Sequence, residues 1–180
     1  MSLATPRELL IHELSDTMSA EHIVHKVLGQ MASETENTEA RKAMEHHQKE
    51  TEQQIKNLEK VFNMLGEQPE QTTCHAAEGL KKEHDALTEE KPQGHVKELG
   101  LLAGAGKTEH YEIASYTMLH RMAKDLGEKE VAELLKENLD QEKEMARTVE
   151  SLAKEVGKEM KVEMKEQAKQ EKEAEKAAAS

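Results

Sequence analysis

The chain has 180 residues, a formal net charge of −12 and an aromatic content of only 2%. This length fits one domain, or one domain with a tail. The acidic balance argues against a nucleic-acid partner, because binding to a phosphate backbone requires a basic surface. The single cysteine, Cys74, excludes an internal disulfide framework and is typical of a reducing compartment.

The start of the chain is too polar for an export signal or a membrane anchor. Glu8, His12 and Glu13 interrupt its apolar residues. We therefore expect neither the apolar core of a signal peptide nor a membrane span. This predicts a cytoplasmic protein without a membrane partner.

Helix-forming residues dominate the whole sequence. Ala, Glu, Lys, Leu and Met are abundant, and no stretch alternates apolar and polar residues with β-branched enrichment. The first helix is predicted from Pro6 to about Ala32, because residues 5–8 form a capping box with proline at the first helical position. A second helix is predicted over about 37–66, where Gly66 is typical of a helix C-terminus.

The connection that follows is long, and it contains a short helix of its own. Residues 67–94 include a predicted helix over about 74–87, whose thin apolar side suits a place on the flank of a bundle. A crossover of this length allows the third long helix, over about 95–126, to run parallel to the second. Gly127 then predicts a tight turn into a fourth helix that begins near Glu128.

The end of the chain has a different composition. Residues 157–180 are mostly Lys, Glu, Gln and Ala and contain too few apolar residues to bury a core. We therefore divide the chain into a helical bundle domain, 1–156, and a charged low-complexity tail, 157–180, which is either helical or disordered.

Acidic residues interrupt the apolar stripe of each long helix. The stripes follow the three-and-four spacing of an amphipathic helix, with Glu21 on the first, Glu50 on the second, Glu109 and Glu112 on the third and Glu142 on the fourth. A plain bundle would place Leu or Ala at these positions.

Helix lengths predict that these carboxylates meet. Glu21 lies 15 residues after the predicted start of the first helix, and Glu50 lies 15 residues before Leu65, at the end of the second. Since the two helices are antiparallel, both carboxylates lie about 22 Å along the bundle from the same end. Glu112 and Glu142 each lie 14 residues from the turn between the last two helices, so they also share one layer.

A buried layer of carboxylates needs compensation, because each desolvated charge costs several kcal/mol. Two metal ions provide it, as in di-iron and di-manganese bundles. We therefore predict a site for two iron or manganese ions. Its candidate ligands are Glu21, His47, Glu50, Glu109, Glu112 and Glu142. Any one of these Glu could instead reach solvent from the edge of its stripe.

Two aromatic side chains near the predicted layer have open roles. His47 lies one turn before Glu50, so it could bind a metal ion, orient a ligand or fill the stripe. Tyr116 lies one turn after Glu112, where it could donate a hydrogen bond to a ligand carboxylate or serve as an ordinary core aromatic residue.

Four stretches of the sequence resemble the YciF-type family of ferritin-like proteins. They are LIHELSDTMSAEHIV (Leu10–Val24), HHQKETEQQIKNLEKVFNMLGEQP (His46–Pro69), AAEGL (Ala76–Leu80) and KTEHYEIASYTMLH (Lys107–His120). The resemblance extends over roughly 9–152. It implies a ferritin-like antiparallel four-helix bundle akin to rubrerythrin, with one long crossover carrying a short extra helix. It also implies a stress-associated bacterial protein that forms a homodimer.

The sequence departs from the usual ferritin-like pattern in its histidines. Related di-iron sites carry Glu-x-x-His on the second and fourth helices, whereas here Gln53 follows Glu50 at that spacing and Met145 follows Glu142. A site richer in carboxylates and poorer in imidazole is suited to manganese, or to iron held differently. Cysteine pairs of the rubredoxin type are absent from the sequence.

Three hypotheses about function follow. The first is a non-haem dinuclear metal protein with peroxide or oxygen chemistry, for which no catalytic residue is assigned. The alternative is a structural or interaction protein, a helical dimer whose metal site is vestigial. An iron-storage shell is the least supported of the three.

Overall fold

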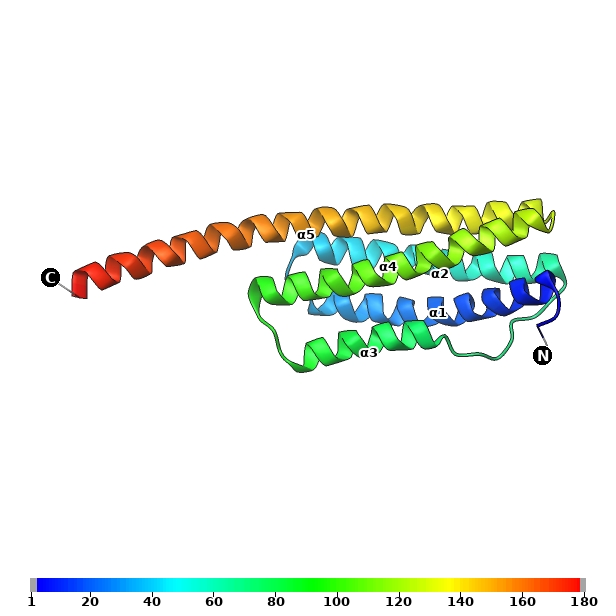
Figure 1. Ribbon diagram of the computed structural model, residues 1–180, viewed down its shortest axis with the longest axis horizontal. Helices are drawn as coiled ribbons and strands as arrows, with labels where there is room; N and C mark the ends of the chain where they lie inside the picture. Colours follow the sequence, from blue (N-terminus) through cyan, green and yellow to red (C-terminus); the bar gives the residue numbers. More distant parts are fainter. Residues whose placement is uncertain (1–2, 179–180) are drawn as a thin grey trace.

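The computed structural model describes residues 3–178, which fold into five helices and no strand (Figure 1). The helices are α1 (Pro6–Glu34), α2 (Thr38–Leu65), α3 (His75–Glu89), α4 (Gly94–Asp125) and α5 (Lys129–Ala178). The four long helices form an antiparallel bundle, and α3 lies on its flank. The predicted fold, an all-α ferritin-like four-helix bundle with one long crossover carrying a short extra helix, is confirmed.

Local chemistry sets the ends of the first two helices. The Thr5 side chain accepts a hydrogen bond from the Glu8 backbone N–H, and the Glu8 carboxylate accepts one from the Thr5 backbone N–H, which completes the capping box. Asn37 caps the start of α2 by accepting hydrogen bonds from two backbone N–H groups. Gly66 ends α2 with a φ of 69°, a left-handed conformation that favours glycine.

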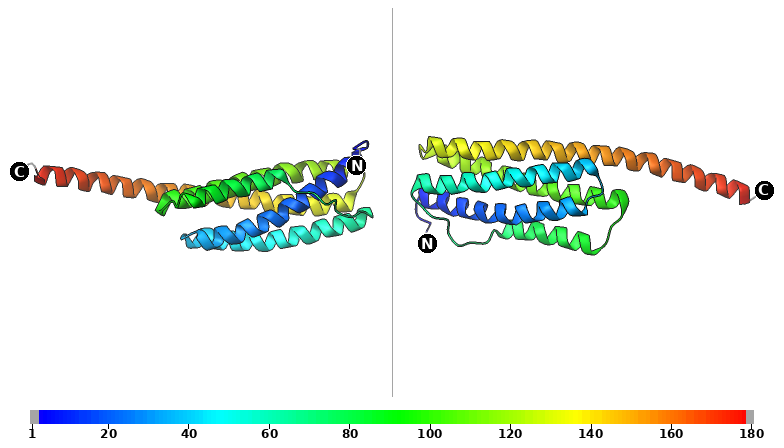
Figure 2. Two further views of the ribbon diagram at one scale, coloured as in Figure 1. Left: turned by 90° about the horizontal axis from the view of Figure 1, so that it is seen from below. Right: turned by 180° about the vertical axis from the view of Figure 1, so that it is seen from behind.

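The crossover returns the chain along the outside of the bundle. After Gly66 the chain runs to α3, which packs against α1 and α4 (Figure 2). Consequently α4 starts at the same end of the bundle as α2 and runs parallel to it (Figure 1). Gly127, with a φ of 80°, then closes the turn between α4 and α5.

Two apolar clusters stabilise the bundle, one toward each end. The first includes Leu14, Leu58, Leu119 and Leu135, and it draws on all four long helices. The second does the same and includes Leu28, Met44, Leu102 and Val149. Between the clusters each long helix buries polar side chains, so the core is interrupted by a polar layer near the middle of the bundle.

Helix α5 continues well beyond the ends of the other helices (Figures 1 and 2). Every residue over 161–173 is exposed, including Val162 and Met164, although Glu163 forms an ion pair with His95 at 2.9 Å. None of the helices in the described part of the chain has a stretch that is both long and apolar enough to cross a bilayer.

We predict that removing residues 165–180 leaves the free energy of unfolding within about 0.5 kcal/mol of the full chain, because residues 165–173 are all exposed and exposed positions away from packed contacts contribute little. Chemical denaturation measures this value. A core substitution in the first cluster, Leu135→Ala, is the control for sensitivity and should cost about 3 kcal/mol. A truncated chain that loses as much stability as this control would show that the extension supports the bundle.

Candidate metal centre

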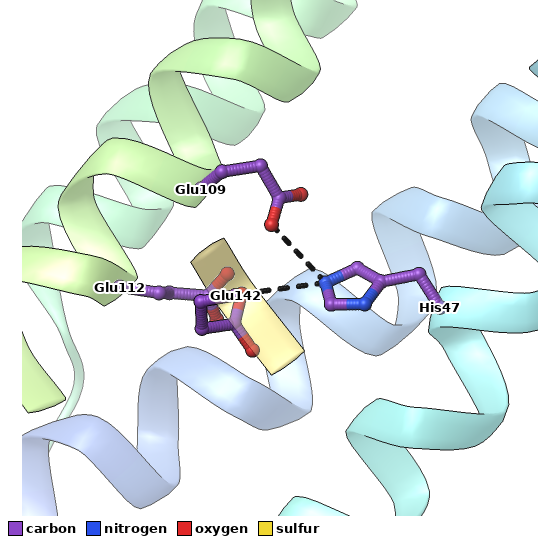
Figure 3. Close-up of side chains that lie close together, drawn as sticks. All are labelled: His47, Glu109, Glu112 and Glu142. Carbon is purple, nitrogen blue, oxygen red and sulfur yellow. Dashed lines mark ion pairs between the residues drawn. The ribbon is translucent and has the colours of Figure 1, made fainter. Parts of the chain in front are cut away.

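The polar layer is a cluster of fully buried ionisable side chains contributed by all four long helices. Glu21 comes from α1, His47 from α2, Glu109 and Glu112 from α4 and Glu142 from α5, and each is at most 1% exposed. Four of them, His47, Glu109, Glu112 and Glu142, offer ligand atoms that all lie within 4.8 Å of one another (Figure 3). Such a group could hold a metal ion.

The His47 ring is oriented by contacts on both of its nitrogen atoms. Its Nε2 faces the cluster, 3.3 Å from Glu109 Oε2 and 3.4 Å from Glu142 Oε2 (Figure 3). Its Nδ1 lies 3.1 Å from Glu50 Oε2. A carboxylate at one ring nitrogen fixes the direction in which the other nitrogen points, as metal-binding histidines require.

Glu50 itself lies at the edge of the layer rather than in it. Its side chain is 25% exposed and also approaches the exposed His46, with 3.5 Å between the Nε2 and Oε1 atoms. The residue of this turn that faces the core is Thr51, whose hydroxyl donates to the His47 carbonyl oxygen. Of the six predicted ligands, Glu21 and Glu50 are outside the four grouped residues, and Glu50 is placed to orient His47.

Glu21 is tied to α4 by a hydrogen bond. The Tyr116 hydroxyl donates to Glu21 Oε1, and Asn138 Nδ2 donates to the Tyr116 oxygen at 3.0 Å. Of the two roles considered for Tyr116, the structure shows the hydrogen bond to a carboxylate. Glu142 is tied in the same way, because Gln54 Nε2 donates to its Oε1 atom.

The remaining ligand atoms of the layer have no hydrogen-bond partner. The buried atoms without one are Glu21 Oε2, His47 Nε2, both carboxylate oxygens of Glu109, both carboxylate oxygens of Glu112, and Glu142 Oε2, although His47 Nε2 keeps its ion-pair contacts with Glu109 Oε2 and Glu142 Oε2. An unpaired buried oxygen or nitrogen normally costs free energy. Seven in one layer, contributed by four helices, indicate a site whose natural partner is a cation.

The ionisation of the layer reflects its burial. Burial raises the pKa of Glu21 to about 8, and the charge of Glu142 adds to the effect. Burial likewise raises the pKa of Glu109 to about 8 and raises that of Glu112 well above its usual value. For His47, burial alone would lower the pKa, but its contacts with Glu109 and other carboxylates outweigh burial and raise it.

Three buried amides near the layer have no role assigned to them from the sequence, although the stripe of the second helix includes Gln54. Gln54, Asn57 and Asn138 are at most 2% exposed and lie between α2 and α5. Their spacing carried a usable signal, since Gln54 follows His47 by two helical turns and Asn138 precedes Glu142 by one. Residue type alone did not distinguish them from the many exposed amides of the chain.

Together, the fold and the layer define an all-helical bundle with a buried His/Glu cluster that could hold a metal ion. The chain belongs to the family described as "Domain of unknown function (DUF892)", which matches residues 5–175. It is 38% identical over 144 residues to the protein YciF of Escherichia coli K12, an alignment that covers 79% of this chain and 87% of that protein. The predicted YciF-type family is thus confirmed.

Solved structures agree with this assignment. The crystal structure of the E. coli stress protein YciF has a TM-score of 0.85 and 35% identity, covering 87% of this chain and 99% of that chain. YcfI of Rhodopseudomonas palustris has a TM-score of 0.80 and 34% identity, covering 83% and 95%. A Xanthomonas campestris protein, with a TM-score of 0.71, 23% identity and coverage of 89% and 99%, shares the fold.

We predict that the metal-free protein loses stability as the pH rises. Carboxyl groups that ionise near pH 4.5 when unfolded but near pH 8 when folded bind more protons in the folded state between those values. Stability is therefore highest below the unfolded pKa and is lost as the pH rises through the folded pKa. We expect a loss of about 2 kcal/mol or more between about pH 5 and about pH 8.

Denaturant unfolding with chelator present, repeated across this pH range, measures how steeply the free energy of unfolding falls with pH. The Glu21→Gln/Glu109→Gln variant is the control and should show a shallower slope, because it lacks two of the responsible groups. If the stability of the wild type does not change with pH, or changes as that of the variant does, the pH dependence does not come from Glu21 and Glu109.

Proposed function

We propose that this stress-family protein binds a dinuclear centre of iron or manganese in the polar layer. The observation that supports the proposal best is the set of seven buried ligand atoms in one layer that have no hydrogen-bond partner. The ligands would be Glu21, His47, Glu109, Glu112 and Glu142, with Glu50 orienting His47. A purely structural bundle gains nothing from this arrangement, since each buried carboxylate costs several kcal/mol.

Charge balance favours two divalent ions over one. Four ionised carboxylates carry four negative charges, which two divalent cations neutralise, while the imidazole binds in its neutral form. The donor set is mostly carboxylate oxygen with one nitrogen, a combination suited to manganese and to non-haem iron.

The chemistry of the proposed centre depends on its burial away from solvent. When bound, iron or manganese supplies redox chemistry toward peroxide or oxygen. The chain holds the ligand carboxylates away from bulk water, and its Glu50 contact keeps His47 Nε2 directed into the layer. The proposal further includes a cytoplasmic location and a homodimer formed through helix faces.

A structural role is the second candidate. The description of YcfI suggests a structural protein, and this chain lacks the Glu-x-x-His imidazoles of related di-iron sites. In that case the polar layer is vestigial, and removing its acids should only stabilise the bundle.

Metal-dependent stability separates the two candidates. We predict that Mn²⁺ or anaerobic Fe²⁺ stabilises the wild-type protein by about 2.7 kcal/mol at a concentration of about 100 times Kd, reversibly with chelator. The Glu21→Gln/Glu142→Gln variant, which keeps the side-chain volumes but loses two charges, should show no such gain. Thermal unfolding with and without metal measures the difference.

Glu137→Ala is the matched control, because Glu137 is an exposed acid on the same helix as Glu142. It should respond to metal as the wild type does. Equal responses of the wild type and the double variant would place any bound metal outside the layer. A wild-type protein that does not respond, together with a more stable double variant, would establish the structural role.

A further inference from the structure

Helices α2 and α5 bury a run of amide side chains next to the proposed metal centre. Gln54, Asn57 and Asn138 are at most 2% exposed, although none belongs to the group of ligand atoms. Buried amides cost free energy unless they are hydrogen-bonded, so their hydrogen bonds show what they do.

The amide hydrogen bonds form a chain that leads to Glu21. Gln53 Nε2 donates to Asn57 Oδ1 at 3.0 Å, and Asn57 Nδ2 donates to Asn138 Oδ1 at 2.9 Å. Asn138 Nδ2 donates to the Tyr116 oxygen at 3.0 Å, and the Tyr116 hydroxyl donates to Glu21 Oε1. Every donor in this chain points toward the carboxylate, and such bonds polarise and strengthen one another.

This direction determines which oxygen of Glu21 is free. A tyrosine hydroxyl has a single proton. Because Asn138 occupies the Tyr116 oxygen as an acceptor, the proton of Tyr116 is directed to Glu21 Oε1. Only the Oε2 atom of Glu21 then remains unpaired.

Gln54 has the same effect on Glu142. Its Nε2 donates to Glu142 Oε1 and also to Gln141 Oε1, the latter at 3.0 Å. Only Oε2 of Glu142 then lacks a hydrogen bond, and it lies 3.4 Å from His47 Nε2, whereas both oxygens of Glu109 and of Glu112 lack one. The layer thus offers single oxygens from α1 and α5 and pairs of oxygens from α4.

We propose that Tyr116 and Gln54 are positioning residues that limit Glu21 and Glu142 to one metal-binding oxygen each, and that Asn138 and Asn57 lock Tyr116 in this role. The inference rests on the proposed metal function. As a consequence, fewer protein oxygens bind the ions than if Glu21 and Glu142 each bound through both of their oxygens. Without the hydroxyl of Tyr116, Glu21 is free to bind through both oxygens.

Cobalt substitution tests the inference, because the visible absorption of Co²⁺ weakens as its coordination number rises. In the Co²⁺-loaded Tyr116→Phe variant, this absorption should fall by about twofold or more, with an unchanged number of ions per chain. Asn138→Leu, which removes the donor to Tyr116 at similar volume, should change the spectrum in the same direction. If Tyr116→Phe does not fold, the cobalt spectrum of Asn138→Leu tests the inference by itself.

Tyr111→Phe is the matched control. Tyr111 lies on the same helix, but its hydroxyl contacts Cys74 and Asp16 outside the layer. Loss of the Tyr111 hydroxyl should leave the cobalt spectrum unchanged.

Lower stability with an unchanged spectrum in both Tyr116→Phe and Asn138→Leu would overturn the inference and leave the metal function intact. Failure of the wild type to bind Co²⁺, Mn²⁺ and Fe²⁺ would instead overturn the proposed function, and the inference with it.

Discussion

The bundle is organised around a layer of buried carboxylates that the protein itself does not fully satisfy. Four glutamates and one histidine meet between two apolar clusters, and seven of their ligand atoms have no hydrogen-bond partner. The clusters supply hydrophobic burial on both sides of the layer. They allow the fold to hold its acids at fixed positions, at a cost in free energy that a bound cation would offset.

The side chains around the layer determine which of its ligand atoms are available to a metal ion. Glu50 directs His47 Nε2 inward, Tyr116 occupies one oxygen of Glu21, and Gln54 occupies one oxygen of Glu142. These contacts come from polar residues that the sequence places on core-facing stripes, where a purely structural bundle would use Leu or Ala. The polar supporting network is therefore as much a part of the candidate site as the ligands are.

Most of the fold could be predicted from the sequence, because its signals are local. The capping box at Thr5, the C-terminal Gly66 and the turn at Gly127 each depend on a few neighbouring residues. The composition of the charged segment after residue 156 permits both helix and disorder, so the sequence alone does not decide between them. In the structure α5 continues through it to Ala178 as one helix.

The candidate site was predictable only in part. Helix lengths predicted one layer for Glu21 with Glu50 and one for Glu112 with Glu142, and the structure buries Glu21, Glu112 and Glu142 close together while Glu50 stays at the edge. On α2 the spacing admitted both His47 and Glu50, and the choice depended on how that helix is rotated against its neighbours. That rotation, like the hydrogen bonds of Asn57 and Asn138, is set by tertiary packing, which periodicity does not specify.

The metal content of protein purified without chelator or affinity metal tests the central claim most directly. Elemental analysis, normalised per chain, should find about two iron or manganese ions, as the carboxylate count requires. Less than about a tenth of that amount, even after anaerobic loading, would contradict the account, because a site of this donor set should retain its ions through purification.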